Sequence, residues 1–147
     1  MEREDPGFAE FLQAWNELMN AVAHVRGRGA VAGEVGLTVA QALLLRTADE
    51  LDHPTVGAVA AALGIASPSA TRMLQQLERR GMVRRDRSEL DERATVITVT
   101  PDGARALEEF WQRIRERQRQ LYAGVDPRLR PALTELLLSM RDVINDI

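Results

Sequence analysis

The side chains of this sequence that are best suited to chemistry are arginines. All 19 basic residues are arginines, and five of them fall between Arg79 and Arg87, with only Asp86 opposing them. A guanidinium group can form two hydrogen bonds at once to a phosphate or a carboxylate, so such a cluster favours an anionic partner. The formal net charge of the chain is -3, so one basic surface would attract that partner while the rest repels it. A salt-bridged surface stretch is the alternative interpretation.

Other kinds of chemistry are poorly supported by the sequence. The chain has no cysteine, which excludes disulfides, thiolate zinc sites, cysteine nucleophiles and thiol-based sensing. His24 and His53 lie far apart, with no acidic or histidine partner at ligand spacing. We therefore expect no metal and no cofactor, although a site built mainly from carboxylates stays open. No activated nucleophile, phosphate-cradling glycine loop or convergent acid–base pair is present, so an enzyme is not expected.

Two short helices joined by a tight turn would position the arginine cluster. The pattern predicts one helix over residues 56–63 that ends at Gly64. A second helix follows, with Ser67 as its N-cap, Pro68 at its first position and Gly81 as its C-terminal stop. Such a pair is the signature of a helix-turn-helix.

The outward face of the second helix contains no Asp or Glu, although the chain has 22 acidic residues. Arg72 can form two hydrogen bonds to guanine, and Gln75 or Gln76 can form two to adenine. Hydroxyl groups and free N–H groups at a helix start suit phosphate oxygens. An ordinary solvated helix face is the alternative. The residues predicted to contact DNA from the helices are Thr38, Ser67, Pro68, Ser69, Thr71, Arg72, Gln75 and Gln76.

A β-hairpin is predicted after Gly81, where the apolar period changes towards two. Its strands cover residues 83–87 and 94–99, and the connector between them is polar. An arginine at the tip of a hairpin can enter the minor groove, and others can neutralise phosphates. Asp91 lies two residues before Arg93 and is placed to orient its guanidinium, although this could be only a charged turn. The predicted contacts of the hairpin are Arg84, Arg85, Arg87, Asp91 and Arg93.

Longer helices are predicted towards both ends of the chain. Apolar steps of three and four indicate helices over residues 8–25, 101–123 and 129–147. A further helix begins with Thr38 as N-cap and Gln41 completing a capping box. The fold class is therefore mainly α, with a small β-hairpin wing beside a helix-turn-helix.

The terminal helices carry more apolar surface than a small lobe can cover. We assign residues 37–100 to a winged helix-turn-helix lobe, and residues 1–30 and 105–147 to a helical region that forms a homodimer. An ordinary monomer core is the alternative. The predicted interface residues are Phe8, Phe11, Trp15, Leu129, Leu133, Leu136, Leu137, Met140 and Ile144.

The length of 147 residues suits one compact unit. No apolar run approaches the roughly 18–20 residues of a membrane span. Residues 1–5 are charged and do not resemble a signal peptide. A cytoplasmic protein without membrane contact is the expectation.

A series of short motifs in the central block carries a family resemblance. They are Gln41 after Thr38, VGAVA at 56–60, LGI at 63–65, SPSATRML at 67–74, LERRGMV at 77–83, DER at 91–93, and TVT at 98–100 followed by Gly103. With these motifs the chain resembles the MarR family of transcriptional regulators. The ends match only in their pattern of helices.

The resemblance implies a homodimer whose two winged lobes bind a pseudo-palindromic double-stranded DNA site. Arg93 matches the family's wing arginine, and Asp91 matches the aspartate that orients it. Many members repress nearby genes until a small aromatic molecule binds between the lobes. Trp15 and Trp111 could line such a site, although aromatic residues on an apolar face also suit a core. A winged helix that binds an acidic protein partner is the rival function.

Overall fold

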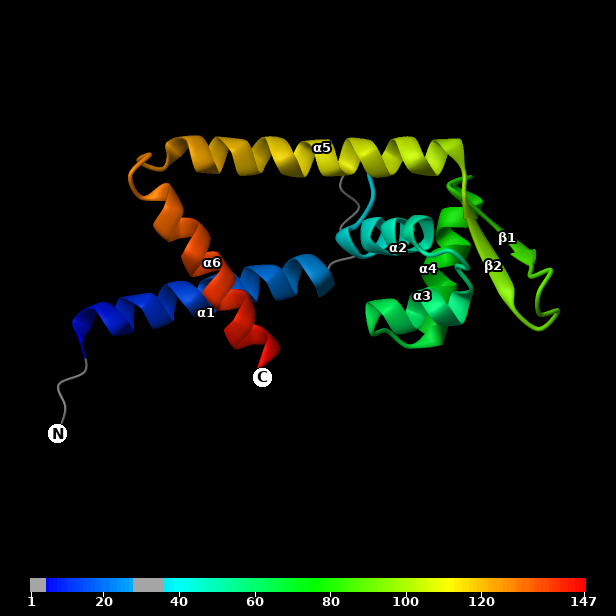
Figure 1. The fold of residues 1–147 in the computed structure, drawn as a ribbon, viewed down its shortest axis with the longest axis horizontal. Coiled ribbons are helices and arrows are strands. Elements are labelled where there is room, and N and C mark those ends of the chain that lie inside the picture. The colour runs from blue at the N-terminus through cyan, green and yellow to red at the C-terminus, as the bar shows by residue number, and fades with distance from the viewer. Residues whose placement is uncertain (1–4, 28–35) are drawn as a thin grey trace. The chain divides into compact units, whose positions relative to one another are not determined.

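The computed structural model describes residues 5–27 and 36–147, and these residues form helices and one hairpin (Figure 1). The elements are α1 (Pro6–Gly27), α2 (Val39–Glu50), α3 (Val56–Leu63), α4 (Ser67–Arg79), β1 (Val83–Arg87), β2 (Thr95–Val99), α5 (Pro101–Gly124) and α6 (Arg130–Asn145). The predicted fold class, mainly α with a hairpin wing, is confirmed. The chain divides into two compact units, Met1–Phe110 and Trp111–Ile147.

The core of the first unit lies among α2, α3, α4 and the hairpin. Leu44, Val59, Leu74, Leu77 and Ile97 are fully buried, one or two from each of these elements. Aliphatic side chains from four elements therefore meet in one interior, whose burial stabilises the helix-turn-helix.

Met73 of α4 is only half-buried, unlike its apolar neighbours Ala70, Leu74 and Leu77. It lines a cavity of about 270 Å³ together with residues of α2, of the end of α3 and of the turn after it, namely Val39, Ala40, Leu43, Leu63 and Ile65. All of these side chains are apolar.

Local caps begin α2 and α3 and end α3 where the sequence predicts these helix ends. The Thr38 side chain accepts the Gln41 N–H at 3.1 Å, and the Gln41 side chain accepts the Thr38 N–H at 3.1 Å, which completes the capping box. Thr55 caps α3 in the same way by accepting the Ala58 N–H. Gly64 ends α3 with a φ of 63°, in the left-handed region that glycine adopts without strain.

The start of α4 differs from the prediction by one residue. Ala66, not Ser67, is the N-cap, and no side chain caps this end. The Ala66 carbonyl accepts the first N–H groups of the helix, from Ser69 at 3.0 Å and from Ala70 at 3.1 Å. Ser67 and Pro68 thus occupy the first helical turn, where the N–H that proline lacks would have had no intrahelical partner.

The wing is an antiparallel pair of strands, in which Val83 pairs with Val99 and Arg87 with Thr95. The segment before α3 extends this sheet. The Ile97 N–H donates to the Pro54 carbonyl at 2.8 Å, and Thr55 forms an isolated bridge with Val96. The wing is therefore joined by backbone hydrogen bonds to the entry of the helix-turn-helix.

The base of the wing is attached to the start of α5 through Thr100. Its hydroxyl donates to the Gly81 carbonyl at 2.6 Å and accepts the Gly103 N–H at 3.1 Å. Gly103 is buried, and a Cβ at this position would overlap the Met82 carbonyl oxygen and lie 3.1 Å from Val99 Cγ1. Glycine is thus required for this close approach.

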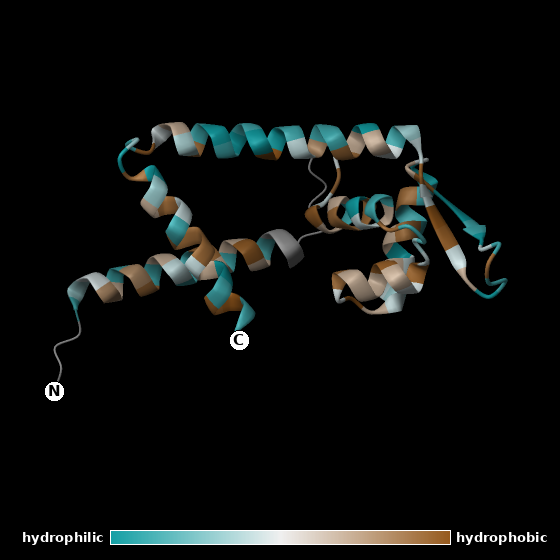
Figure 2. Ribbon diagram, viewed as in Figure 1, coloured by the Kyte–Doolittle hydropathy of each residue, from teal (hydrophilic) through white to brown (hydrophobic). Residues whose placement is uncertain are grey.

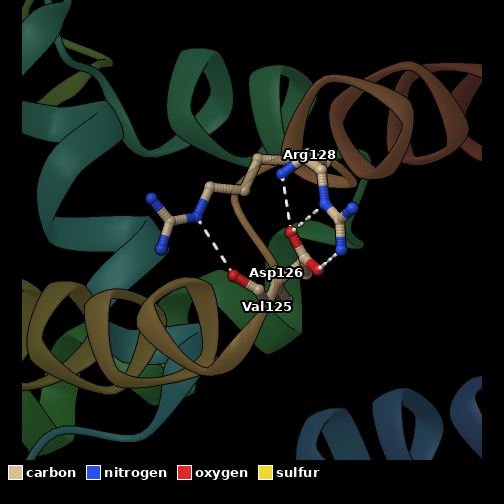
Figure 3. Close-up of polar contacts among 4 residues, drawn as sticks. Val125, Asp126 and Arg128 are labelled. Atoms are coloured by element: carbon tan, nitrogen blue, oxygen red, sulfur yellow. Dashed lines mark hydrogen bonds and ion pairs between the residues drawn. The ribbon is translucent and has the colours of Figure 1, made fainter.

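In the second unit, an exposed corner joins α5 to α6 (Figure 3). Asp126 accepts the Arg128 N–H at 2.9 Å and its Nη2 at 2.8 Å, while Arg130 Nε donates to the Val125 carbonyl at 3.3 Å. The Arg128 side chain and then its backbone N–H hold the pKa of Asp126 below its ordinary value. The Arg130 guanidinium also lies 4.5 Å from the centre of the Tyr122 ring.

Apolar residues recur along α1 and α6 (Figure 2). None of the residues of α6 is buried. Phe8, Phe11, Leu129, Leu136, Leu137 and Ile144 are exposed, whereas Trp15, Leu133 and Met140 are half-buried. Within the part of the chain that the structure describes, no helix has the length and apolar character to span a membrane.

Candidate nucleic-acid interface

The amphipathic character of α4 separates a core face from a polar face. Ala70, Leu74 and Leu77 point into the core. The predicted DNA-contacting residues on the other side are Ser67, Pro68, Ser69, Arg72, Gln75 and Gln76, which are exposed, and Thr71, which is half-buried. The structure therefore brings these residues together on one accessible helix face.

The two glutamines of this face are held differently. Gln76 Oε1 accepts a hydrogen bond of 3.4 Å from Gln41 Nε2. Gln41 also belongs to the capping box with Thr38, so Gln76 ties the polar face of α4 to the start of α2. Gln75 is exposed and, among the described contacts, has no such tie. Gln75 is thus the better placed of the two to contact a base.

The arginines of the wing also divide into two groups. Arg84 and Arg87 on β1 and Arg93 at the tip are exposed. Arg85 instead donates from Nε at 2.9 Å and from Nη2 at 2.7 Å to Glu78 Oε2 near the end of α4. The charge of Arg85 is therefore already compensated, and its side chain joins the wing to α4.

Asp91 orients the turn of the wing through the backbone. The sequence predicts that it holds the Arg93 guanidinium, but the contact in the structure runs from the Arg93 backbone N–H to Asp91 Oδ1, at 3.0 Å. A residue two positions away offers its N–H in an Asx turn, which short aspartate side chains readily accept. The Arg93 side chain is exposed at the tip.

Three residues that the sequence analysis missed hold the interface in place. Glu78 accepts from Arg85, and Ser88 forms a hydrogen bond with His53 from the segment before α3. Ser88 is buried, and its hydroxyl also accepts the backbone N–H groups of Leu90 and Asp91. The only sequence signal was a lone serine at the end of a strand, in a connector of mostly charged residues.

The two tryptophans predicted to line an effector site lie in different units. Trp15 is half-buried on α1, with its ring 6.0 Å from that of Phe11. Trp111 is half-buried on α5. A ligand site formed by both stays a prediction.

Comparison with known proteins gives a family match for the central block. The model of the MarR family matches residues 37–95. A Bacillus subtilis (strain 168) protein, the uncharacterized HTH-type transcriptional regulator YdgJ, is 34% identical over 85 residues, which are 58% of this chain and 52% of that protein. The chain thus spans about half the length of the curated relatives that it matches.

Solved structures share the fold over most of the chain. FabT of Streptococcus pneumoniae in complex with DNA has a TM-score of 0.69 and 18% identity, over 95% of this chain and 96% of FabT. Bordetella bronchiseptica BpsR, studied for regulation of its DNA binding by 6-hydroxynicotinic acid, has a TM-score of 0.62 and 24% identity, over 88% of this chain and 98% of BpsR. The family match thus covers residues 37–95, which hold the helix-turn-helix and most of its wing, while the solved structures show that the fold is shared over most of the chain.

Proposed function

We propose that this protein is a transcriptional regulator that binds a specific double-stranded DNA sequence as a homodimer. The observation that carries the proposal is the exposed polar face of α4, which lacks acidic residues from Ser67 to Leu77 and belongs to the same compact unit as the exposed wing arginines. An α-helix with these donors fits the major groove, where each base pair presents a distinct pattern. So assigned, the protein is not an enzyme.

Base reading and phosphate binding fall to different residues in this proposal. Arg72 and Gln75 read bases from α4, because their exposed side chains offer paired hydrogen-bonding groups. Arg84 and Arg87 neutralise phosphates, and Arg93 at the tip enters the minor groove. Thr38, Ser67, Pro68, Ser69 and Thr71 lie at or near helix starts and approach the DNA backbone. Arg85 and Gln76, each held within the protein, support the interface instead.

A second copy of the chain covers the terminal helices. Leu136, Leu137 and Leu138 of α6 are 47%, 55% and 47% exposed, and Phe8 and Phe11 of α1 are 51% and 44% exposed. Apolar faces of this extent on two helices indicate an interface, and a two-fold homodimer is the commonest arrangement. Its symmetry would match a pseudo-palindromic DNA site.

Repression that a small aromatic effector relieves is the proposed mode of regulation. Support comes from the family resemblance and from BpsR, whose DNA binding is regulated by 6-hydroxynicotinic acid. Trp15 and Trp111 are the candidate ligand contacts in this chain.

Fluorescence anisotropy with a labelled duplex from upstream of the protein's own gene tests the DNA-binding function. The matched control is a scrambled duplex of the same composition, and both are measured at three salt concentrations. We expect preference for the upstream duplex and an affinity that falls steeply as salt rises. Equally weak binding to every duplex tried, including fragments selected from random sequence, would contradict the proposal. In that case a pull-down would test the rival function, a winged helix that binds an acidic protein.

A further inference from the structure

Ser88 links the wing loop to the segment that enters α3. It follows the last residue of β1 and is 4% exposed, although every residue from Glu89 to Arg93 is exposed. Its hydroxyl oxygen lies 3.2 Å from the Leu90 nitrogen, 3.3 Å from the Asp91 nitrogen and 3.2 Å from His53 Nε2. A single buried hydroxyl thus contacts both the wing loop and the segment before α3.

The donors around Ser88 determine which way its proton points. A serine hydroxyl has one O–H to donate and two lone pairs that accept. The N–H groups of Leu90 and Asp91 occupy both lone pairs, so the O–H must donate to His53 Nε2. His53 can accept only as a neutral imidazole with its proton on Nδ1. A protonated His53 would direct its Nε2–H at an oxygen that already accepts two hydrogen bonds. The hydroxyl proton of Ser88 would then lose its acceptor.

These contacts continue to the tip of the wing. Ser88 fixes the Asp91 N–H, and the Asp91 carboxylate in turn accepts the Arg93 N–H at 3.0 Å. The Ser88 backbone N–H also donates to the Ala94 carbonyl at 2.9 Å, which closes the loop. The position of the Arg93 backbone therefore depends on Ser88 through two hydrogen bonds.

We propose that Ser88 and His53 are positioning residues for the wing, which hold Arg93 in place for DNA while His53 is neutral and release it when His53 is protonated. This inference rests on the proposed DNA-binding function. The charged residues of the adjoining segments are Asp49, Glu50 and Asp52 on the histidine's own side, and Asp86, Arg87, Glu89, Asp91, Glu92 and Arg93 on the wing. All are exposed, so solvent and salt screen their charges. Protonation of the imidazole is therefore the change that acts directly on the Ser88 hydroxyl.

Amide hydrogen exchange of the wing, followed by NMR without DNA, tests the contact directly. At pH 8, Ser88→Ala should speed exchange at Leu90 and Asp91 by about tenfold, the factor expected for loss of about 1.4 kcal/mol of hydrogen bonding. The amides of Leu44 and Leu74 in the core should keep their rates. Unchanged rates at Leu90 and Asp91 would overturn the proposal, whatever the protein does with DNA.

Variants of His53 test whether this residue accepts a hydrogen bond from the Ser88 hydroxyl. His53 is exposed, so His53→Phe and His53→Gln should both fold. His53→Phe removes the acceptor of the Ser88 hydroxyl but leaves the oxygen that accepts the two N–H groups, so it should speed exchange at Leu90 and Asp91 by less than Ser88→Ala does. His53→Gln keeps an acceptor and should keep the slow exchange of the unaltered protein. The same exchange in both variants would contradict the role of the acceptor.

Anisotropy with the upstream duplex from pH 8 to pH 6 connects the contact to DNA binding. The affinity of the unaltered protein should fall severalfold relative to that of His53→Gln as the pH is lowered over this range. His24→Gln, at the other histidine, should keep the pH dependence of the unaltered protein. A constant ratio between the unaltered protein and His53→Gln would refute the pH dependence. Fast exchange in Ser88→Ala beside a complete lack of DNA binding would instead uphold the contact and reject the proposed function.

Discussion

Arg85 and Glu78 are joined by two hydrogen bonds that end on the same carboxylate oxygen, from Nε at 2.9 Å and from Nη2 at 2.7 Å. The pair connects β1 to the last turn of α4, seven residues earlier in the chain. One arginine of the basic cluster therefore connects α4 to the wing, while its neighbours Arg84 and Arg87 remain exposed.

Alanine substitutions at Arg84 and Arg85 should have different effects. Arg85→Ala should lower the free energy of unfolding by about 1 kcal/mol, because the ion pair is hydrogen-bonded but partly exposed. Arg84→Ala should leave stability unchanged and reduce the slope of log K against log salt by about one. Chemical denaturation and salt-dependent anisotropy measure the two quantities. Identical effects of the two variants on both would contradict the distinction.

Arg72→Ala should relax sequence discrimination at one base position. The loss of a paired contact to a base is expected to cost about 1–3 kcal/mol for the preferred duplex and little for a duplex mutated at that position. Binding to a panel of singly mutated duplexes measures this. Arg84→Ala is the comparison, since loss of a phosphate contact weakens all duplexes equally. Undiminished discrimination by Arg72→Ala would remove this residue from base reading.

Gly103→Ala should destabilise the first unit. The added Cβ would overlap the Met82 carbonyl, and a clash with backbone is expected to cost about 3 kcal/mol in the free energy of unfolding. Gly57→Ala is the matched control, because nothing lies within 4 Å of its added Cβ and its φ is negative. That variant should be neutral or stabilised by up to about 1 kcal/mol. Thermal denaturation followed by circular dichroism compares them, and equal midpoints would show that Gly103 is not needed for the close approach.

Leu137→Glu should weaken the proposed homodimer. A charge placed in an apolar interface lacks a partner and loses its hydration. Analytical ultracentrifugation should give twice the 16.4 kDa of one chain for the unaltered protein and a shift towards the monomer for the variant. Glu135→Lys, on the opposite side of α6 by its helical spacing, should stay dimeric. A monomeric unaltered protein at micromolar concentration would reject the dimer.

Asp126 should remain ionised at a lower pH than an ordinary aspartate. The Arg128 side chain, followed by the Arg128 backbone N–H, lowers the pKa of Asp126 in the folded corner. The contribution of ionised Asp126 to the stability of the folded protein is therefore present above the pKa of this residue in the unfolded chain. It is lost as the pH falls through the pKa of Asp126 in the folded protein. Carboxyl ¹³C NMR titration should give a higher midpoint in Arg128→Ala than in the unaltered protein. The same midpoint in both would rule out the hydrogen bond from the Arg128 side chain as the main cause.

The sequence by itself determined the elements whose ends depend on near neighbours. Thr38 with Gln41, Thr55 with Ala58, and Gly64 mark helix ends through contacts within three residues or through a left-handed φ. The polar face of α4 and the two strands of the wing follow from apolar periodicity in the same way. Such interactions are local, so they can be inferred before the fold is known.

Only the tertiary structure decided which side chains of the interface are held and which are accessible. Gln76 forms a hydrogen bond with Gln41, and Ser88 forms one with His53, each across 35 residues of sequence. Arg85 forms an ion pair with Glu78. The uncapped start of α4 at Ala66 was also set by the tight turn before it. A partner that lies far along the chain is brought close only when the core packs, and neither composition nor spacing carries that information.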